Sequence, residues 1–245
     1  SHMMDRELFD FNASSQNGFP YDDFHVLIGL VPSLMHERPA RVFAVGLGAG
    51  STAYGLSQDP RIREVRCVEI CAGQKPLLGR LAQLDSPETA RLFSDPRVSI
   101  QIGDGRKALL ATTERYDVIT VDALRPTTAY SGNIYSVEFY ELVRSRLNPG
   151  GLVATWLPTE GTAESLRRVF PHMLVFDVLH YNNSRFVVAR AEPFRFDRER
   201  VLERLKAIDL QSAFPSGQHA SLPRYLSEVQ RRVLEGEPAQ DEERI

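Results

Sequence analysis

Three glycines alternate with other residues in the segment VFAVGLGAGSTA, which runs from Val42 to Ala53. Apolar residues precede Gly46, Gly48 and Gly50 and small residues follow them, so we expect a buried strand that turns sharply into a helix. Such a turn lets the backbone approach a nucleotide or a nucleoside. The dinucleotide fingerprint requires glycine or alanine where Ser51 stands, so the turn alone also leaves open a tight turn with no ligand.

Two acidic residues stand where a nucleoside would need them. Glu69 ends the next apolar segment about 20 residues after the first glycine, where a carboxylate can hold both ribose hydroxyls. Ile70, which follows it, is a further predicted contact of the nucleoside. Asp104 and Gly105 lie in GDGR, where the carboxylate can accept from the exocyclic amine of adenine and glycine lets the backbone approach the ring. Together with the apolar segment YDVITVDA, they predict a nucleoside site of the S-adenosylmethionine type.

Asp122 ends the strongly apolar segment YDVITVDA and is the predicted catalytic residue. Group transfer from a sulfonium needs an oriented donor, an unprotonated nucleophile and exclusion of water. If the nucleophile is an alkylamine, whose pKa is about 10, a carboxylate beside it can position the amine and take its proton. A helix cap or a loop-stabilising role is the alternative for Asp122.

The predicted substrate-binding residues are Arg125, Tyr130, Tyr135 and His25. Arg125 favours an acceptor that carries a carboxylate, because guanidinium pairs with planar anions through two hydrogen bonds. The tyrosines could line the acceptor cavity, and His25 could face the donor tail. Each also has an ordinary interpretation, as a solvated loop arginine, core tyrosines and a core histidine.

Strand-like and helical segments alternate along the chain, which predicts a parallel sheet with right-handed crossovers. An apolar helix at 24–37, stopped by Pro39, comes first, and a helix begins after the N-cap Ser136 and ends at the NPGG segment, 148–151. The predicted strands are 41–45, 64–70, 97–102, 116–123 and 151–157, followed by a hairpin at 173–190 with its turn at Asn182 and Asn183.

This order predicts an α/β fold with a doubly wound, mostly parallel seven-stranded sheet of the class I methyltransferase type. It ends in an antiparallel hairpin and carries a C-terminal helical extension. The expected divisions are a tag scar at 1–3, an N-terminal segment and helix at 4–39, the catalytic domain at 40–192, the helical extension at 193–236 and a disordered tail at 237–245.

The composition of the chain argues against a nucleic-acid-binding protein, a membrane-spanning protein and a zinc protein. The net charge of −3 and pI near 6.1 give no electrostatic reason to expect nucleic-acid binding. The sequence lacks an apolar run long enough to span a membrane, and its two cysteines, Cys67 and Cys71, lack the spacing of a zinc site. We therefore expect a cytoplasmic protein with no metal and with neither nucleic acid nor a membrane as partner, and we leave open a homodimer.

The chain resembles the spermidine synthases, or polyamine aminopropyltransferases, over roughly residues 22–158. The resemblance is carried by YDDFHVLIGLVPSL, DPRVSIQIGDGRKAL, YDVITVDA and YSVEFYELVRSRLNPGG. It implies transfer of an aminopropyl group from decarboxylated S-adenosylmethionine to an amine, leaving 5′-methylthioadenosine, and hence a place in polyamine biosynthesis.

Two departures from the family pattern affect this expectation. Ala49 stands where the family has an Asp that holds the amino group of the donor, and Arg125 stands where it has a second Asp after Asp122. We therefore expect an amine acceptor other than putrescine. The alternatives are a methyltransferase that uses intact S-adenosylmethionine and a nucleoside-binding domain without turnover; a nicotinamide oxidoreductase would leave Asp104 without a role.

Overall fold

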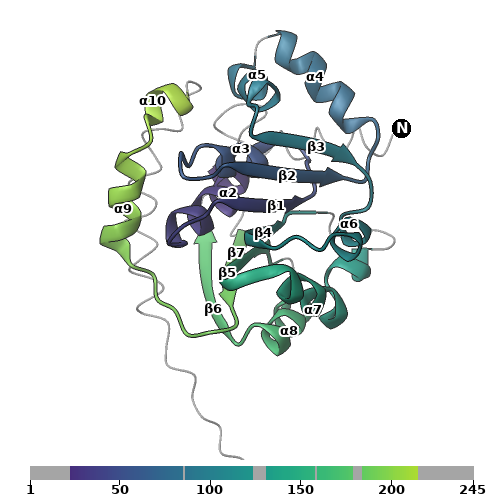
Figure 1. Ribbon diagram of the computed structural model, residues 1–245, viewed down its shortest axis with the longest axis vertical. Helices are drawn as coiled ribbons and strands as arrows, with labels where there is room; N and C mark the ends of the chain where they lie inside the picture. Colours follow the sequence, from purple (N-terminus) through teal and green to yellow (C-terminus); the bar gives the residue numbers. More distant parts are fainter. Residues whose placement is uncertain (1–22, 85, 124–130, 158, 179–183, 215–245) are drawn as a thin grey trace, which may run out of the picture.

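A seven-stranded sheet forms the centre of the computed structural model, which describes residues 23–214 apart from 85, 124–130, 158 and 179–183 (Figure 1). The strand order is β3-β2-β1-β4-β5-β7-β6. The strands are β1 (Arg41–Val45), β2 (Glu64–Glu69), β3 (Val98–Ile102), β4 (Tyr116–Val121), β5 (Leu147–Trp156), β6 (His172–Val178) and β7 (Ser184–Arg190). The predicted α/β fold with a seven-stranded sheet is confirmed.

Strands β3, β2, β1, β4 and β5 are parallel, whereas β7 pairs antiparallel with both β5 and β6. The chain builds outward from β1 in one direction to β3 and then returns to add β4 on the other side of β1. Ligands of such sheets bind beyond the carboxyl ends of the strands at this switch point. The last residue of β1, Val45, pairs there with Val68 and Val121.

Helices cover both faces of the sheet (Figure 1). They are α2 (Asp23–Met35), α3 (Ser51–Ser57), α4 (Gln74–Leu84), α5 (Pro87–Ser94), α6 (Gly105–Ala111), α7 (Val137–Arg146), α8 (Glu160–Val169), α9 (Arg198–Lys206) and α10 (Leu210–Ala213), with a 3₁₀ turn η1 (Ser131–Ile134). Alternate residues of β1 enter different cores: Val42 and Ala44 pack with α2 and α3, Phe43 and Val45 with α6 and α7.

Most strand boundaries differ from the sequence-based expectation by one or two residues, and the larger differences lie at α2, α7 and β5. Helix α2 accommodates Pro32 and ends at Met35, before the predicted stop at Pro39. Ser136 caps α7 as predicted, accepting a hydrogen bond from the Phe139 N–H, but α7 ends at Arg146, and 148–151 already belong to β5. The pairing of β5 with β4 shifts register there, which accommodates Gly150 at φ 79°.

The chain after β7 packs against the helices beside β1. Val201 and Leu205 of α9 are buried with α2 residues in one core, and Tyr54 of α3 stacks edge-on with Phe214. The predicted hairpin of β6 and β7 is confirmed, while its turn at 182–183 and the predicted tail at 237–245 lie outside the described residues.

Candidate active site

The glycine turn lies at the carboxyl end of β1, as predicted. Gly46, Gly48 and Gly50 have φ angles of 96°, 50° and 94°, in the left-handed region that favours glycine. A Cβ atom on Gly46 would lie 2.4 Å from the backbone oxygen of Asp122, so this glycine lets the turn touch the segment after β4. A Cβ on Gly48 would meet no atom within 4 Å, so the turn is open on that side.

Glu69 ends β2 beside the glycine turn and is buried. Its Oε2 accepts from the N–H of Leu47 at 2.7 Å and of Gly48 at 3.4 Å, and its Oε1 accepts from the N–H of Cys71 at 2.7 Å. The Gln74 amide also donates to the carbonyl of Gly48. Glu69 therefore holds the turn itself, and ribose hydroxyls would share its oxygens with these backbone donors, which sequence reasoning did not foresee.

Asp104 and Gly105 have local roles at the start of α6. Asp104 is the N-cap, and its Oδ1 accepts from the N–H of Arg106 at 2.8 Å and of Lys107 at 3.1 Å. A Cβ on Gly105 would lie 2.8 Å from Val45 Cγ1, so packing against β1 already requires glycine. The capping bonds use only Oδ1, and the predicted contact of Asp104 with adenine stays a prediction.

Two apolar side chains are exposed next to these acids. Ile70, predicted as a nucleoside contact, is 65% exposed, and Ile102, which pairs with Glu69 across the sheet, is 45% exposed. Exposed isoleucines at the ends of adjacent strands provide an apolar surface of the kind that a nucleobase can pack against. Ile102 was missed, although its position just before GDGR was a usable signal.

Asp122 follows β4 and donates its backbone N–H to the Val45 carbonyl at 3.1 Å. Its side chain is 12% exposed, and Oδ2 receives two contacts, from His25 Nδ1 at 2.7 Å and from Thr52 Oγ1 at 2.5 Å. The structure thus joins His25 to the predicted catalytic residue. The predicted contact of His25 with substrate stays a prediction. Thr52 was not predicted, because Asp122, with which it forms its hydrogen bond, is distant in the sequence.

Close packing of α2 on α3 brings these groups together. A Cβ on Gly29 would lie 2.2 Å from the Thr52 carbonyl oxygen, and one on Gly55 would lie 2.4 Å from the Val26 carbonyl oxygen. Any larger residue would separate the two helices. Since His25 comes from α2 and Thr52 from α3, the two glycines set the distance between the two groups that contact Asp122.

Tyr135 packs against the segment that follows β4 and forms a hydrogen bond with it. It is buried, and its hydroxyl donates to the carbonyl of Ala123 at 3.1 Å. Burial, assisted by the charge of Asp122, raises the pKa of Tyr135 well above its usual value, so the hydroxyl remains protonated. The guanidinium of Arg106 also donates to the carbonyl of Asn133, at 2.7 Å.

The other predicted acceptor residues, Arg125 and Tyr130, lie outside the described residues. Within the described part of the chain, no group of three or more His, Cys, Asp and Glu side chains could hold a metal ion. Burial raises the pKa of the Cys67 thiol, which argues against a reactive thiolate there. A search of the same residues finds no helix with the length and apolar character of a membrane span.

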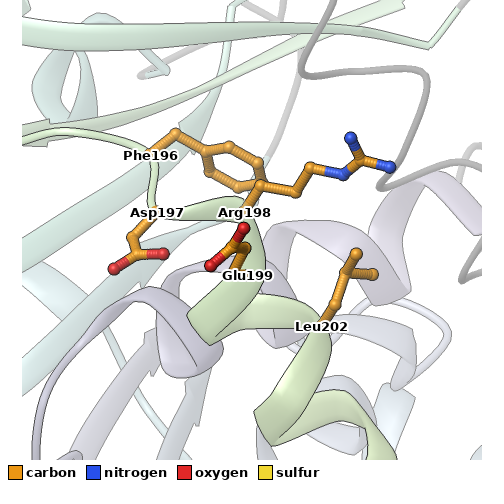
Figure 2. Close-up of a pocket in the computed structure, with 5 residues that line it drawn as sticks. All are labelled: Phe196, Asp197, Arg198, Glu199 and Leu202. Atoms are coloured by element: carbon orange, nitrogen blue, oxygen red, sulfur yellow. The ribbon is translucent and has the colours of Figure 1, made fainter.

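A hollow of about 540 Å³ lies elsewhere, at the start of α9 (Figure 2). It is lined by Phe196, Asp197, Arg198, Glu199 and Leu202. In Figure 1, α9 lies on the side away from the arrowheads of β1, β2 and β3. None of the residues predicted from the sequence lines this hollow, so we place the candidate site at the carboxyl edge of the sheet instead.

Comparison with solved structures supports the fold. The chain superposes on a spermidine synthase in complex with the transition-state analogue AdoDATO with a TM-score of 0.66, at 19% identity over 84% of this chain and 75% of that one. It superposes on human methyltransferase-like protein 13 in complex with SAH with a TM-score of 0.56, at 20% identity over 91% and 94%.

Sequence comparison identifies the family. A polyamine aminopropyltransferase of Thermococcus kodakarensis is 30% identical over 241 residues, which cover 88% of this chain and 78% of the relative. Putrescine N-methyltransferase 2 of Nicotiana tabacum is 31% identical over 145 residues, 58% of this chain but only 38% of the tobacco enzyme. The spermine/spermidine synthase domain model matches residues 22–159. The chain therefore belongs to the spermine/spermidine synthase domain family, whose related members are aminopropyl and methyl transferases.

Proposed function

We propose that the chain transfers an aminopropyl group from decarboxylated S-adenosylmethionine to an amine other than putrescine. The observation that carries the proposal is the position of Asp122. Its backbone touches the glycine turn at Gly46, and its carboxylate contacts only His25 and Thr52 among the described residues. A proton acceptor therefore adjoins the turn expected to hold the donor.

The residues around the turn fit an adenosyl donor. Glu69 would hold the ribose, with Ile70 and Ile102 against the base, and Asp104 would accept from the adenine amine. The open side of Gly48 would admit the ligand to the backbone. The fit rests on observed burial, exposure and backbone conformation, and every one of these residues belongs to the carboxyl edge of β1, β2 or β3.

The chain supplies orientation and a proton acceptor. A sulfonium donor supplies a carbon whose bond to sulfur breaks, with the electron pair kept by sulfur, as the amine nitrogen forms the new bond. Asp122 accepts the proton that leaves this nitrogen. Because an alkylamine is mostly protonated at neutral pH, the carboxylate also attracts and orients it before the reaction.

Methyl transfer from intact S-adenosylmethionine is the second candidate. It is favoured by Ala49, because the segment between Gly48 and Gly50 then has no carboxylate for the amino group of the donor. The tobacco relative, named a putrescine N-methyltransferase, supports it as well. For either donor we propose that Arg125 disfavours diamines, since a guanidinium repels a second ammonium group and attracts a carboxylate.

Mass analysis of the nucleoside product separates these candidates. The protein is incubated with each donor and a panel of amines that includes putrescine and amines bearing a carboxylate. Methylthioadenosine is the expected product, formed with the second group of amines, whereas S-adenosylhomocysteine would assign methyl transfer. Efficient use of putrescine would overturn the acceptor proposal. Tight nucleoside binding with no product from any pair would indicate a binding domain.

A further inference from the structure

Two hydrogen-bond donors from different helices meet at a single oxygen of Asp122. His25 Nδ1 of α2 lies 2.7 Å from Oδ2, and Thr52 Oγ1 of α3 lies 2.5 Å from the same atom. No residue in the described ranges donates to Oδ1. Among the described residues, the carboxylate is thus held at Oδ2 alone.

The hydrogen positions follow from the chemistry of these groups. An ionised carboxylate can only accept, so the His25 ring must carry a hydrogen on Nδ1. Thr52 has one hydroxyl hydrogen and two acceptors within reach, since the His25 carbonyl lies 3.0 Å away. The shorter contact with the charged oxygen is the stronger one, so this hydrogen points to Asp122.

The geometry points to Thr52 and His25 as a pair of positioning residues, which hold Asp122 Oδ2 so that Oδ1 faces the amine. This inference rests on the proposed function, because it assigns Oδ1 as the atom that accepts the proton. Two donors on one oxygen remove the rotation that would otherwise exchange Oδ1 and Oδ2. The burial of the pair keeps water from competing, since His25 and Asp122 side chains are 10% and 12% exposed.

Thr52→Val tests the pair with little change of shape, because valine replaces the hydroxyl by a methyl group. We expect kcat to fall about tenfold, while the KM for the amine and the Kd for methylthioadenosine stay within about twofold. Thr52→Ser, which restores the hydroxyl, should recover most of the loss. An unchanged kcat, or a raised KM at constant kcat, would overturn the positioning role and indicate packing or substrate contact.

Ser57→Ala provides the matched control on the same helix. Ser57 is also buried, and its hydroxyl donates to the Tyr54 carbonyl at 2.8 Å rather than to Asp122. We expect this variant to retain kcat. If both variants lose activity equally, loss of a buried hydroxyl from α3 is the cause and the positioning role fails.

Nitrogen-15 NMR of the imidazole rings tests the same contacts without any substrate. The signal of His25 is assigned from its absence in His25→Gln, and the ligand-free protein should show the tautomer protonated on Nδ1. Asp122→Ala should abolish that preference. A ring protonated on Nε2 alone would overturn the inference even if turnover were observed. If no donor and acceptor pair gives turnover, the proposed function fails, while the NMR result still decides whether His25 holds Asp122.

Discussion

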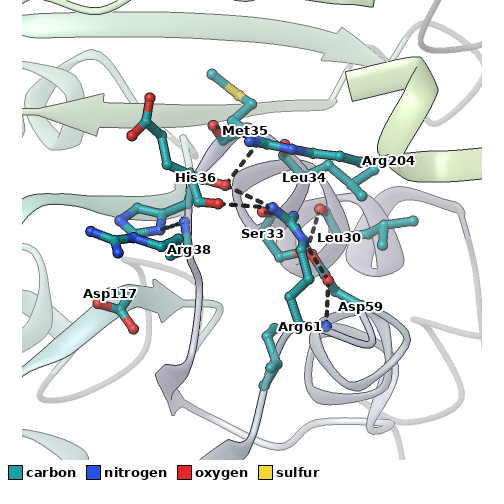
Figure 3. Close-up of polar contacts among 12 residues, drawn as sticks. Leu30, Ser33, Leu34, Met35, His36, Arg38, Asp59, Arg61, Asp117 and Arg204 are labelled. Carbon is teal, nitrogen blue, oxygen red and sulfur yellow. Dashed lines mark hydrogen bonds and ion pairs between the residues drawn. The ribbon is translucent and has the colours of Figure 1, made fainter. Parts of the chain in front are cut away.

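The two ends of helix α2 are held by opposite kinds of chemistry. At the first turn, His25 meets a carboxylate whose other described contact is a neutral hydroxyl. At the last turn, Arg61 donates to the carbonyls of Ser33 and His36, and Arg204 donates to those of Leu34 and His36 (Figure 3). Guanidinium groups complement the negative end of the helix dipole and satisfy the last carbonyl groups, which have no partner within the helix.

The last turn of α2, with Arg61 and Arg204 bound to its carbonyls, is called here the arginine end, and a buried aspartate pairs with one of these arginines. Asp59 is fully buried, and its Oδ2 lies 2.6 Å from the guanidinium of Arg61. A second Asp-Pro-Arg segment repeats this arrangement before β3, where Arg97 pairs with Asp95 at 2.7 Å and donates to the Ser57 carbonyl. At these sites each acid is neutralised by an adjacent arginine.

The comparison shows where to look for chemistry. Asp59 and Asp95 are each paired with an arginine, so their charges stabilise the fold. Asp122 instead has one carboxylate oxygen, Oδ1, with no donor among the described residues, and it lies beside the open glycine turn. Substitutions at the two ends of α2 should therefore differ in kind: those near Asp122 should lower turnover, and those near Arg61 should lower stability.

Asp122→Asn should lower turnover by about a thousandfold, because the amide cannot take a proton and general-base catalysis contributes about 10²–10⁴. The affinity for methylthioadenosine should stay within about twofold, since the residues expected to bind it are unchanged. Steady-state kinetics and titration calorimetry measure the two effects. An active variant would show that another group accepts the proton. The first turn of α2 would then no longer differ from its last turn in having a role in the reaction.

Asp59→Ala should act in the opposite way, on stability alone. Removing Asp59 leaves the Arg61 guanidinium, whose side chain is 29% exposed, with carbonyl acceptors but no counter-charge. The cost should be about 3 kcal/mol, the lower end of the range for a buried pair. Urea unfolding measures the loss, and turnover per folded molecule should be retained. A stable variant with impaired kcat would show that the arginine end also takes part in the reaction.

Gly29→Ala should lower the free energy of unfolding by about 1–3 kcal/mol, because the new methyl group would lie 2.2 Å from the Thr52 backbone oxygen. Turnover should fall as well, since His25 and Thr52 would move apart. Gly79→Ala is the control inside α4: its Cβ would meet nothing closer than Phe93 at 3.8 Å, so it should stabilise by about 0.5–1 kcal/mol. Equal effects of the two variants would refute the close-packing argument.

Much of the carboxyl edge could be predicted from the sequence, because its signals are local. Strand-to-glycine transitions located Gly46 and Asp122, and the spacing from the glycines located Glu69. Thr52 could not be found this way, since its contact with Asp122 depends on how α2 crosses α3. For Asp104, the same GDGR pattern suits a helix cap and an adenine contact equally well.

The smallest expected effect concerns His36, beside the arginine end of α2 (Figure 3). Burial lowers the pKa of His36 below its usual 6.5; Arg190 and Arg61 add to the shift, while Asp117 and Glu37 oppose it. The neutral ring accepts the Arg38 backbone N–H at Nδ1, at 3.2 Å. Because the unfolded chain binds this proton more readily, His36 contributes stability above about pH 6.5 that is lost as pH falls toward the pKa of the folded state.

His36→Asn should therefore flatten the decline of unfolding free energy between pH 8 and pH 5, since asparagine keeps an acceptor near the position of Nδ1 but does not titrate. A single proton limits the change in slope to about 1.4 kcal/mol per pH unit. Urea unfolding at several pH values measures it, and the stability of the variant relative to that of the natural protein should rise as pH falls from 8 to 5. A parallel decline of both proteins would show that His36 does not drive the acid sensitivity of this end of the helix.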